Sequence, residues 1–220
     1  MSRYKYTGVL LLLLTWGQTG LQGQVGLVLN AATIDISEDR IYIFSRGTRS
    51  KAYLLAHQFN TRDTNSTHVG IGFYQDHRFF IYNVIDEAPE GKSALVINSL
   101  DSFLLGEDVS SFSLWECANS VQDLALMKTL LRNYMNKKIA FDVQFKLAED
   151  DSLYCSEFCA QVLNRLGGKR FDFPPINRPL NNPLFEAVLG RMNIYYYPVD
   201  FFQRSAFVRK VYEWRRKQGE

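Results

Sequence analysis

The sequence predicts a single α+β domain in which an antiparallel sheet packs against helices. Two runs rich in β-branched and aromatic residues, 68–74 and 79–85, flank a short polar turn, which is the pattern of a β-hairpin. Residues 121–135 and 155–166 instead place apolar residues three and four positions apart, as on one face of a helix. The chain has 220 residues, 46% of them hydrophobic, which is enough material for one core.

The other elements are expected from the same local signals, taken in chain order. The expected strands and extended segments are 41–45, 94–97, 112–115, 141–145 and 195–198. The expected helical segments are 51–59, 100–104 (a short turn or helix), 184–189 and a terminal helix at 201–217. The expected loops are the polar stretch 60–67 and the proline-rich stretch 173–183. Gly167 and Gly168 are a stop signal for the helix that contains Cys155.

The first 24 residues read as an export signal. Arg3 and Lys5 precede an apolar run at 9–14, and small or polar residues follow. The run is too short to span a bilayer, which needs about 20 residues. We therefore predict a signal peptide at 1–24, a single domain at 25–220, and a periplasmic or extracellular location in a bacterial envelope.

Charge argues against nucleic acid as a partner. Without Arg3 and Lys5, the 25 basic residues fall to 23, which balances the 23 acidic residues of the chain. A neutral body lacks the basic surface that phosphate backbones require. The basic residues at 209–217 read as the solvated face of the terminal helix, with peripheral contact to a membrane or cell wall as the alternative. The sequence gives no indication of the oligomeric state.

Cysteine usage points to one reactive thiol. Three cysteines do not make a disulfide framework, and Cys155 and Cys159 lie on one helix face with parallel Cβ vectors. A lone C-x₃-C and three histidines do not assemble a zinc set, so no metal or other cofactor is expected. Cys155 follows the acidic loop 149–152 at the start of a helix. There, unpaired backbone N–H groups and the helix dipole favour a thiolate. A packed structural thiol is the competing explanation of Cys155.

A cysteine nucleophile needs a base, and His68 is the best placed of the three histidines. It begins the first strand of the hairpin, whereas His57 reads as a helix-surface residue and His77 as a solvated turn residue. Asn83 lies on the paired strand, where a polar side chain among apolar neighbours must be hydrogen-bonded. It could orient the His68 ring. The alternatives for that role are Asp86 and Glu87, and a structural hydrogen bond is the competing explanation of Asn83.

These residues carry a family resemblance. His-Val-Gly-Ile at 68–71, well upstream of Tyr-Cys-Ser-Glu-Phe at 154–158, resembles the permuted papain-like amidases of the YaeF/YiiX group in the NlpC/P60 superfamily. The histidine strand precedes the cysteine helix in that group and in lecithin:retinol acyltransferase-like proteins. The resemblance covers about 68–166 and implies a circularly permuted papain-like fold.

The resemblance also implies roles for individual residues. Cys155 would be the nucleophile, His68 the base and Asn83 the third polar residue, a position commonly held by glutamate in the YiiX-like branch. Asparagine can still orient an imidazole but supplies no charge to an imidazolium. The Cys155 N–H would meet the oxyanion, with Tyr154 as a second contributor. Tyr154 is equally well explained as a hydrophobic contact before the helix.

The function expected from these observations is that of an exported cysteine amidase or peptidase. It would cleave an amide in a peptide, a peptidoglycan peptide or an N-acyl lipid through a thioester intermediate. One alternative keeps the site but transfers the acyl group to a lipid or amine, as the acyltransferase relatives suggest. Another is a non-catalytic envelope module that binds a ligand in the same cleft.

Overall fold

The computed structural model describes residues 34–49, 58–86, 88–104, 108–147 and 151–216. The expected signal peptide at 1–24 and most of the expected helix at 51–59, including His57, lie outside these residues. Within them, no helix combines the length and the apolar character needed to cross a membrane.

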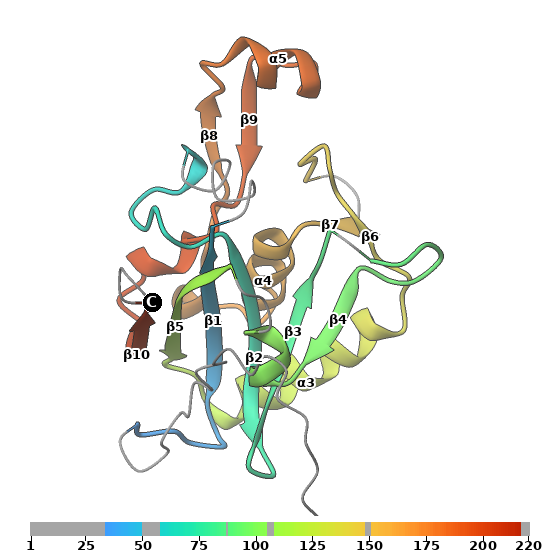
Figure 1. The fold of residues 1–220 in the computed structure, drawn as a ribbon. Coiled ribbons are helices and arrows are strands. Elements are labelled where there is room, and N and C mark those ends of the chain that lie inside the picture. Colours follow the sequence, from blue (N-terminus) through green and yellow to red (C-terminus); the bar gives the residue numbers. More distant parts are fainter. Residues whose placement is uncertain (1–33, 50–57, 87, 105–107, 148–150, 217–220) are drawn as a thin grey trace, which may run out of the picture.

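The architecture is α+β, as predicted, with a six-stranded antiparallel sheet at its centre (Figure 1). The strand order is β10-β5-β1-β2-β3-β4. These strands are β1 (Ile41–Thr48), β2 (His68–Gln75), β3 (Arg78–Val84), β4 (Leu95–Asn98), β5 (Val109–Cys117) and β10 (Val208–Arg215). Two small sheets accompany it, one parallel from β6 (Ala140–Phe141) and β7 (Ser152–Leu153), one antiparallel from β8 (Ile176–Pro179) and β9 (Asn193–Tyr196).

Of the four α-helices in the described residues, three lie on the two faces of the large sheet and the fourth lies beyond its end. They are α2 (Leu100–Phe103), α3 (Val121–Met135), α4 (Cys155–Asn164) and α5 (Pro183–Leu189), with 3₁₀ turns at Lys169–Phe171 and Phe201–Arg204. The two long helices, α3 and α4, cover one face, whereas α2 lies on the other. β8, α5 and β9 form an arm that projects beyond one end of the sheet (Figure 1).

The alternation of side chains along β1 builds a core on each face of the sheet. Ile41 and Ile43 pack in the cluster under α3 and α4, while Tyr42 and Phe44 pack in the cluster that contains Phe103 of α2. Successive side chains of a strand point to opposite faces, so a strand buried on both sides must be apolar throughout. The apolar run at 41–44, in the first half of β1, therefore follows from the central place of this strand in the sheet.

The β2–β3 hairpin forms as the sequence predicts. Gln75 pairs with Arg78 across the two-residue turn Asp76-His77, in which both residues have positive φ, 50° and 60°. Such a turn matches the right-handed twist of the paired strands. The glycines of β2 admit close backbone packing, also as predicted, because a Cβ on Gly72 would lie 1.8 Å from the Phe80 carbonyl oxygen.

The long helices also match the sequence expectation. The α3 helix spans the predicted residues 121–135 and begins with a capping box between Ser120 and Asp123. The α4 helix begins at Cys155, as predicted, and ends at Asn164 before Gly167 and Gly168, both of which have positive φ. The helices at 100–104 and 184–189 and the loop at 60–67 are likewise present.

Three expectations about the later elements were wrong. The terminal helix expected at 201–217 is instead a 3₁₀ turn followed by β10. The strand forms because β5 offers an open edge to the β-branched and aromatic residues of 208–214, a tertiary effect that local periodicity does not show. The proline-rich loop 173–183 contains β8, and the extended segment 141–145 is strand only at its first residue, Phe141. The basic residues at 209–215 therefore lie on an edge strand rather than on a helix.

A buried carboxylate fixes the loop that leads into β2. Asp200 is fully buried and accepts hydrogen bonds from the backbone N–H groups of Thr61, Arg62 and Asp63 at 2.5–3.0 Å. Three charge-assisted bonds offset the cost of burying this group. They tie the segment after β9 to the loop at 60–67, so the start of β2 is held in place from a distant part of the chain.

Candidate active site

Cys155 is the first residue of α4. The short strand β7 leads directly into it, and Tyr154 has extended backbone angles and accepts the first intrahelical hydrogen bond, from the Phe158 N–H, at 3.0 Å. Cys155 is buried, with 9% of the residue exposed, so little of it is accessible to solvent. Its sulfur lies against the backbone N–H groups of Val69 and Ser156. The thiol is therefore held between the start of the helix and the start of β2.

Burial is the dominant influence on the Cys155 thiol. It raises the pKa of Cys155, and the N–H groups of Val69 and Ser156 together with the charge of Arg46 offset only part of this effect. As expected, the Ser156 N–H at the helix start lowers the pKa of Cys155. Burial raises it by more, however, so the overall pKa is raised and the expectation of a thiolate was wrong. The resting side chain is a neutral thiol, and its proton must leave during the reaction.

His68 and Asn83 are in direct contact. The two side chains form a hydrogen bond of 2.9 Å between His68 Nε2 and Asn83 Oδ1. Asn83 Nδ2 in turn donates to Asn98 Oδ1 at 2.7 Å, and Asn98 Nδ2 donates to Ser102 Oγ at 2.8 Å. This chain fixes the orientation of the Asn83 amide and assigns the ring hydrogen of His68 to Nε2. The remaining ring nitrogen, Nδ1, is the one that can accept a proton.

The register of the hairpin explains this contact. Ile71 pairs with Tyr82, so the next positions along the two strands are Gly70 and Asn83. A Cβ on Gly70 would lie 3.3 Å from the Asn83 Cβ and 2.7 Å from Ile81 Cγ2. The absence of a side chain at Gly70 therefore leaves room for Asn83 to reach diagonally across to His68.

The structure brings Cys155 to the same strand end but not into a hydrogen bond with the ring. Its sulfur meets the main chain of Val69, the residue that follows His68. Within the described part of the chain, no hydrogen bond joins Cys155 Sγ to the His68 ring. The Val69 side chain packs under α4, whereas the His68 ring packs 5.6 Å from Phe103 on α2. Bonds of this kind often tighten only when substrate binds.

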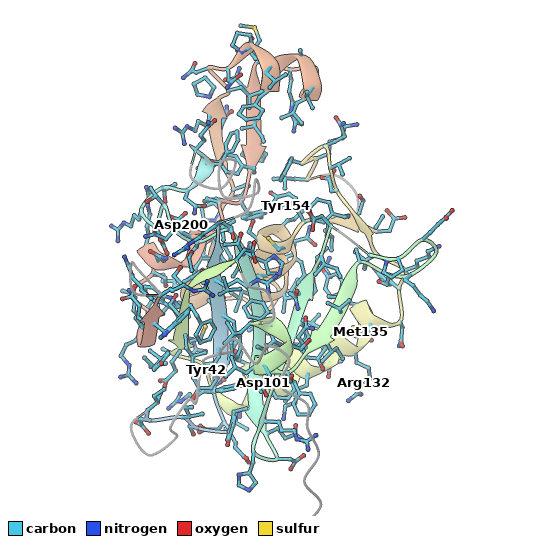
Figure 2. The ribbon with its side chains drawn as sticks, in the orientation of Figure 1. Tyr42, Asp101, Arg132, Met135, Tyr154 and Asp200 are labelled. Carbon is cyan, nitrogen blue, oxygen red and sulfur yellow. The ribbon has the colours of Figure 1, made fainter. Side chains whose placement is uncertain are left out.

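The Tyr154 hydroxyl is engaged with the main chain. It accepts a hydrogen bond from the Tyr197 N–H at 2.8 Å, and Ser156 Oγ donates to the Tyr197 carbonyl oxygen, also at 2.8 Å. Figure 2 shows Tyr154 at the end of the sheet where the arm joins, with Asp200 at the same end. These contacts dock the segment 197–201 on the start of α4.

The structure also locates Asp86, an alternative partner for the His68 ring, and the two other cysteines. Asp86 is exposed, and Glu87 lies outside the described residues. Cys117 and Cys159 are free, fully buried thiols in the core between the sheet and the long helices, and burial raises the pKa of each. This arrangement agrees with the prediction of two core thiols and no disulfide.

Sequence reasoning missed Arg46, which lies beside His68. Arg46 pairs with His68 across β1 and β2, and its guanidinium lies 4.9 Å from the centre of the Phe103 ring. Its Nη1 donates to the Phe103 carbonyl oxygen. The sequence expectation ended the first strand at Ser45, just before Arg46, whereas β1 continues to Thr48. That extension places a cation beside the candidate base.

The pKa of His68 gives a testable prediction. Burial, together with the positive charge of Arg46, lowers this pKa from 6.5 to about 3, although the Asn83 hydrogen bond opposes the shift. The pKa of His68 is lower in the folded protein than in the unfolded chain, so the folded protein disfavours the protonated ring. The corresponding stability is fully present above about pH 6.5, where the ring is neutral in both states. This contribution is lost as the pH falls from 6.5 toward 3.

We therefore expect the His68 ring to stay neutral between pH 5 and 8, with its hydrogen on Nε2. Imidazole ¹⁵N chemical shifts followed across that range would show this directly. Replacement of Arg46 by glutamine should raise the pKa of His68, because it removes the like charge. A wild-type midpoint at or above pH 6.5 would contradict the prediction.

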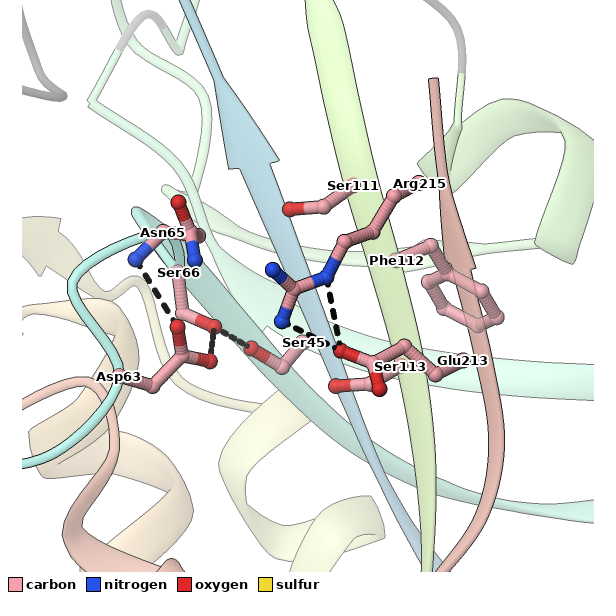
Figure 3. A pocket seen from close by; sticks show the side chains of 9 residues that line it. All are labelled: Ser45, Asp63, Asn65, Ser66, Ser111, Phe112, Ser113, Glu213 and Arg215. Atoms are coloured by element: carbon pink, nitrogen blue, oxygen red, sulfur yellow. Dashed lines mark hydrogen bonds and ion pairs between the residues drawn. The ribbon is translucent and has the colours of Figure 1, made fainter. Parts of the chain in front are cut away.

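A polar pocket lies nearby, and its lining contains neither a cysteine nor a histidine (Figure 3). Ser45 and Ser66 are joined through their hydroxyls at 2.6 Å, and Ser66 Oγ donates to Asp63 Oδ2 at 2.5 Å. Burial raises the pKa of Asp63, but hydrogen bonds from Ser66, Asn65 and Gln203 outweigh it and lower the pKa overall. An ionised carboxylate that accepts these bonds ties the loop to β1, so we read this network as structural.

Comparison with known proteins places the fold. No family model matches the sequence, and no curated protein matches it. The structure is similar to the crystal structure of the metalloprotein YiiX from Escherichia coli O157:H7 (DUF1105), with a TM-score of 0.59. The match covers 80% of this chain and 98% of that chain at 16% sequence identity. At this identity the similarity shows a YiiX-like α+β fold, and the function must be argued from the site.

Proposed function

We propose that this protein is an exported cysteine hydrolase of permuted papain-like fold within the NlpC/P60 superfamily, and that it cleaves an amide bond. One observation carries the proposal. The Cys155 thiol, at the start of α4, lies against the main chain of Val69 in β2. The neighbouring residue, His68, has its ring oriented by Asn83. The fold shared with YiiX and the order of histidine strand before cysteine helix support the same assignment. The basic and apolar segment at 1–24 is the proposed signal peptide.

The proposed reaction begins with two neutral groups. His68 Nδ1 takes the proton of Cys155 as the sulfur attacks the amide carbonyl, and the C–S bond forms as the carbonyl becomes an oxyanion. The backbone N–H of Cys155, at the start of α4, is the proposed oxyanion donor. His68 then returns the proton to the leaving amine, and a thioester remains on Cys155. Water, deprotonated by His68, hydrolyses that thioester and releases the acid.

Asn83 has a defined part in this scheme. Its Oδ1 accepts from Nε2, which keeps the ring in the tautomer that presents Nδ1 to the thiol. An amide supplies no negative charge, so the imidazolium that forms is held by orientation more than by attraction. Proximity to Arg46 makes that imidazolium still less stable, which favours early return of the proton to the leaving amine.

The residues of this site do not fit a metal ion. YiiX is described as a metalloprotein, but in the described ranges of this chain no three side chains of histidine, cysteine, aspartate or glutamate gather to hold one. The charge of Arg46, felt by both Cys155 and His68, also opposes a cation there. We therefore derive no step through a metal.

Amine release from model amides tests the proposal. Acyl-amino acid and short peptide amides with a fluorogenic amine should release it with the wild-type protein. Added hydroxylamine or a primary amine separates the outcomes: water as the main acceptor means hydrolysis, and preferential acyl transfer means that the acyltransferase alternative is correct. A protein that binds such amides without turnover, with affinity unchanged by Cys155→Ser, would be a binding module and would refute the proposal.

A further inference from the structure

Arg46 lies beside the candidate catalytic residues, but the proposed reaction does not require it. It stands opposite His68 in the register of β1 and β2, and its guanidinium and the His68 ring both contact Phe103, at 4.9 and 5.6 Å. Cys155 lies at the same place in the sheet, because its sulfur meets the main chain of Val69, which pairs with Ser45, the residue before Arg46. The positive charge of Arg46 therefore acts on both Cys155, the proposed nucleophile, and His68, the proposed base.

The hydrogen bonding of Arg46 is incomplete. Nη1 donates to the Phe103 carbonyl oxygen, but Nε is buried and has no acceptor among the residues that the structure describes. A buried, charged donor without an acceptor is costly, and such groups are uncommon in folded proteins. An orphaned donor that lies beside a nucleophile has a natural acceptor in a ligand.

The charges around Arg46 only partly balance it. Burial lowers the pKa of Arg46, and the charges of Asp108 and Asp86 oppose this effect. Neither carboxylate comes within ion-pair distance, and in the described ranges no other one does. Asp86 is exposed to solvent, which screens its charge. The guanidinium thus keeps positive charge available for an anion that enters the site.

We propose that Arg46 binds a carboxylate that the substrate carries beside the amide attacked by Cys155. The guanidinium has the fork geometry that matches a carboxylate, and Nε is the donor left for it. The reference to an amide rests on the function proposed above, whereas anion binding beside Cys155 does not. The substrate class would then be acidic amides, such as peptides cleaved next to a free carboxyl group.

Alkylation of Cys155 tests this without requiring turnover. Two matched pairs of reagents are used: iodoacetate with iodoacetamide, and N-bromoacetylglycine with N-bromoacetylglycinamide. In each reaction the sulfur displaces the halide and forms a thioether, and the thiol proton is lost. Each pair differs only in a carboxylate against an amide, so the ratio of the two rates cancels any change in thiol reactivity. Peptide mapping assigns the label to Cys155 rather than Cys117 or Cys159.

We expect Arg46→Gln to lower the anionic-to-neutral rate ratio by about tenfold or more for at least one pair, as the loss of a charge-assisted hydrogen bond implies. Arg46→Lys should restore part of the ratio, because it keeps the charge but not the fork. Arg78→Gln, at the exposed start of β3, is the matched control and should leave the ratio unchanged. Thermal unfolding of each variant confirms that it is folded.

Two outcomes would overturn the inference. An equal fall in both rates for Arg46→Gln would leave the ratio unchanged and show that Arg46 acts on the thiol alone. Unchanged rates with all four reagents would show that water, and not an anionic ligand, satisfies Nε. The proposed function fails separately. If the rate ratio depends on Arg46 but no amide is cleaved, the anion site is supported and the proposed hydrolase activity is refuted. If amides are cleaved but the ratio does not depend on Arg46, the hydrolase activity is supported and the anion site is refuted.

Discussion

Replacing Cys155 with alanine is expected to abolish amide cleavage, with a loss of at least about a thousandfold in kcat/KM. The reason is that no other group near His68 can form the thioester. Alanine removes only the sulfur from a site that is 9% exposed, so the fold should be retained. Release of a fluorogenic amine measures the activity, and circular dichroism with thermal unfolding measures the fold.

The other two cysteines provide matched controls for that variant. Cys117→Ala and Cys159→Ala each remove a fully buried thiol from the same core. They should cost some stability through the small cavity, but they should retain activity within a few-fold of the wild type. A folded Cys155→Ala protein with wild-type turnover would rule out the nucleophile, and loss of activity only in Cys159→Ala would move the assignment there.

His68→Ala should lower kcat/KM by about a hundredfold to ten-thousandfold, the range that a positioned general base contributes. With the thiol pKa raised by burial, very little thiolate exists near neutral pH without the base. The loss should shrink as the pH rises and hydroxide removes the proton instead. A pH profile of kcat/KM for the two proteins measures this difference.

Two further variants bound the interpretation. His77→Ala removes a histidine from the turn at the far end of β2 and should leave activity unchanged. Asn83→Ala should cost less than His68→Ala, because it frees the ring orientation but leaves the base. If His68→Ala changes kcat/KM less than threefold across the pH range, His68 is structural and the proposed mechanism is wrong.

The parts of the fold that follow from local pattern could be predicted. The β2–β3 hairpin depends on alternating residues and a two-residue turn, and α3 on its apolar periodicity and the Ser120 cap. Both signals lie within a few residues of the elements that they specify. The same is true of α4, whose start at Cys155 follows from the change between an acidic loop and an apolar helix.

β10 could not be predicted in this way. Its residues form a strand because the edge of β5 is open to them, and that edge lies about 100 residues earlier in the chain. The strand β8 forms within a proline-rich stretch for a similar reason, through pairing with β9. Strand pairing across such separations is a tertiary property, and it overrides local propensity.

Part of the candidate site could likewise be predicted from the sequence, and part could not. Cys155, His68 and Asn83 were identified from residue type and position, and the His68–Asn83 bond follows from the hairpin register. Arg46 was missed because its role depends on the pairing of β1 with β2, which no local signal reveals. The net raised pKa of Cys155 was also missed, since burial cannot be weighed against the helix start without the fold.

Trapping the acyl-enzyme decides whether Cys155 is the nucleophile. The wild-type protein is mixed with an amide substrate, quenched in acid within the first turnovers, and examined by intact and peptide mass spectrometry. We predict the mass of the acyl group on the peptide that contains Cys155, lost on treatment with neutral hydroxylamine and absent from the Cys155→Ala protein. Amine release by the wild type with no acyl group on Cys155, or with the group on another residue, would contradict the proposed mechanism.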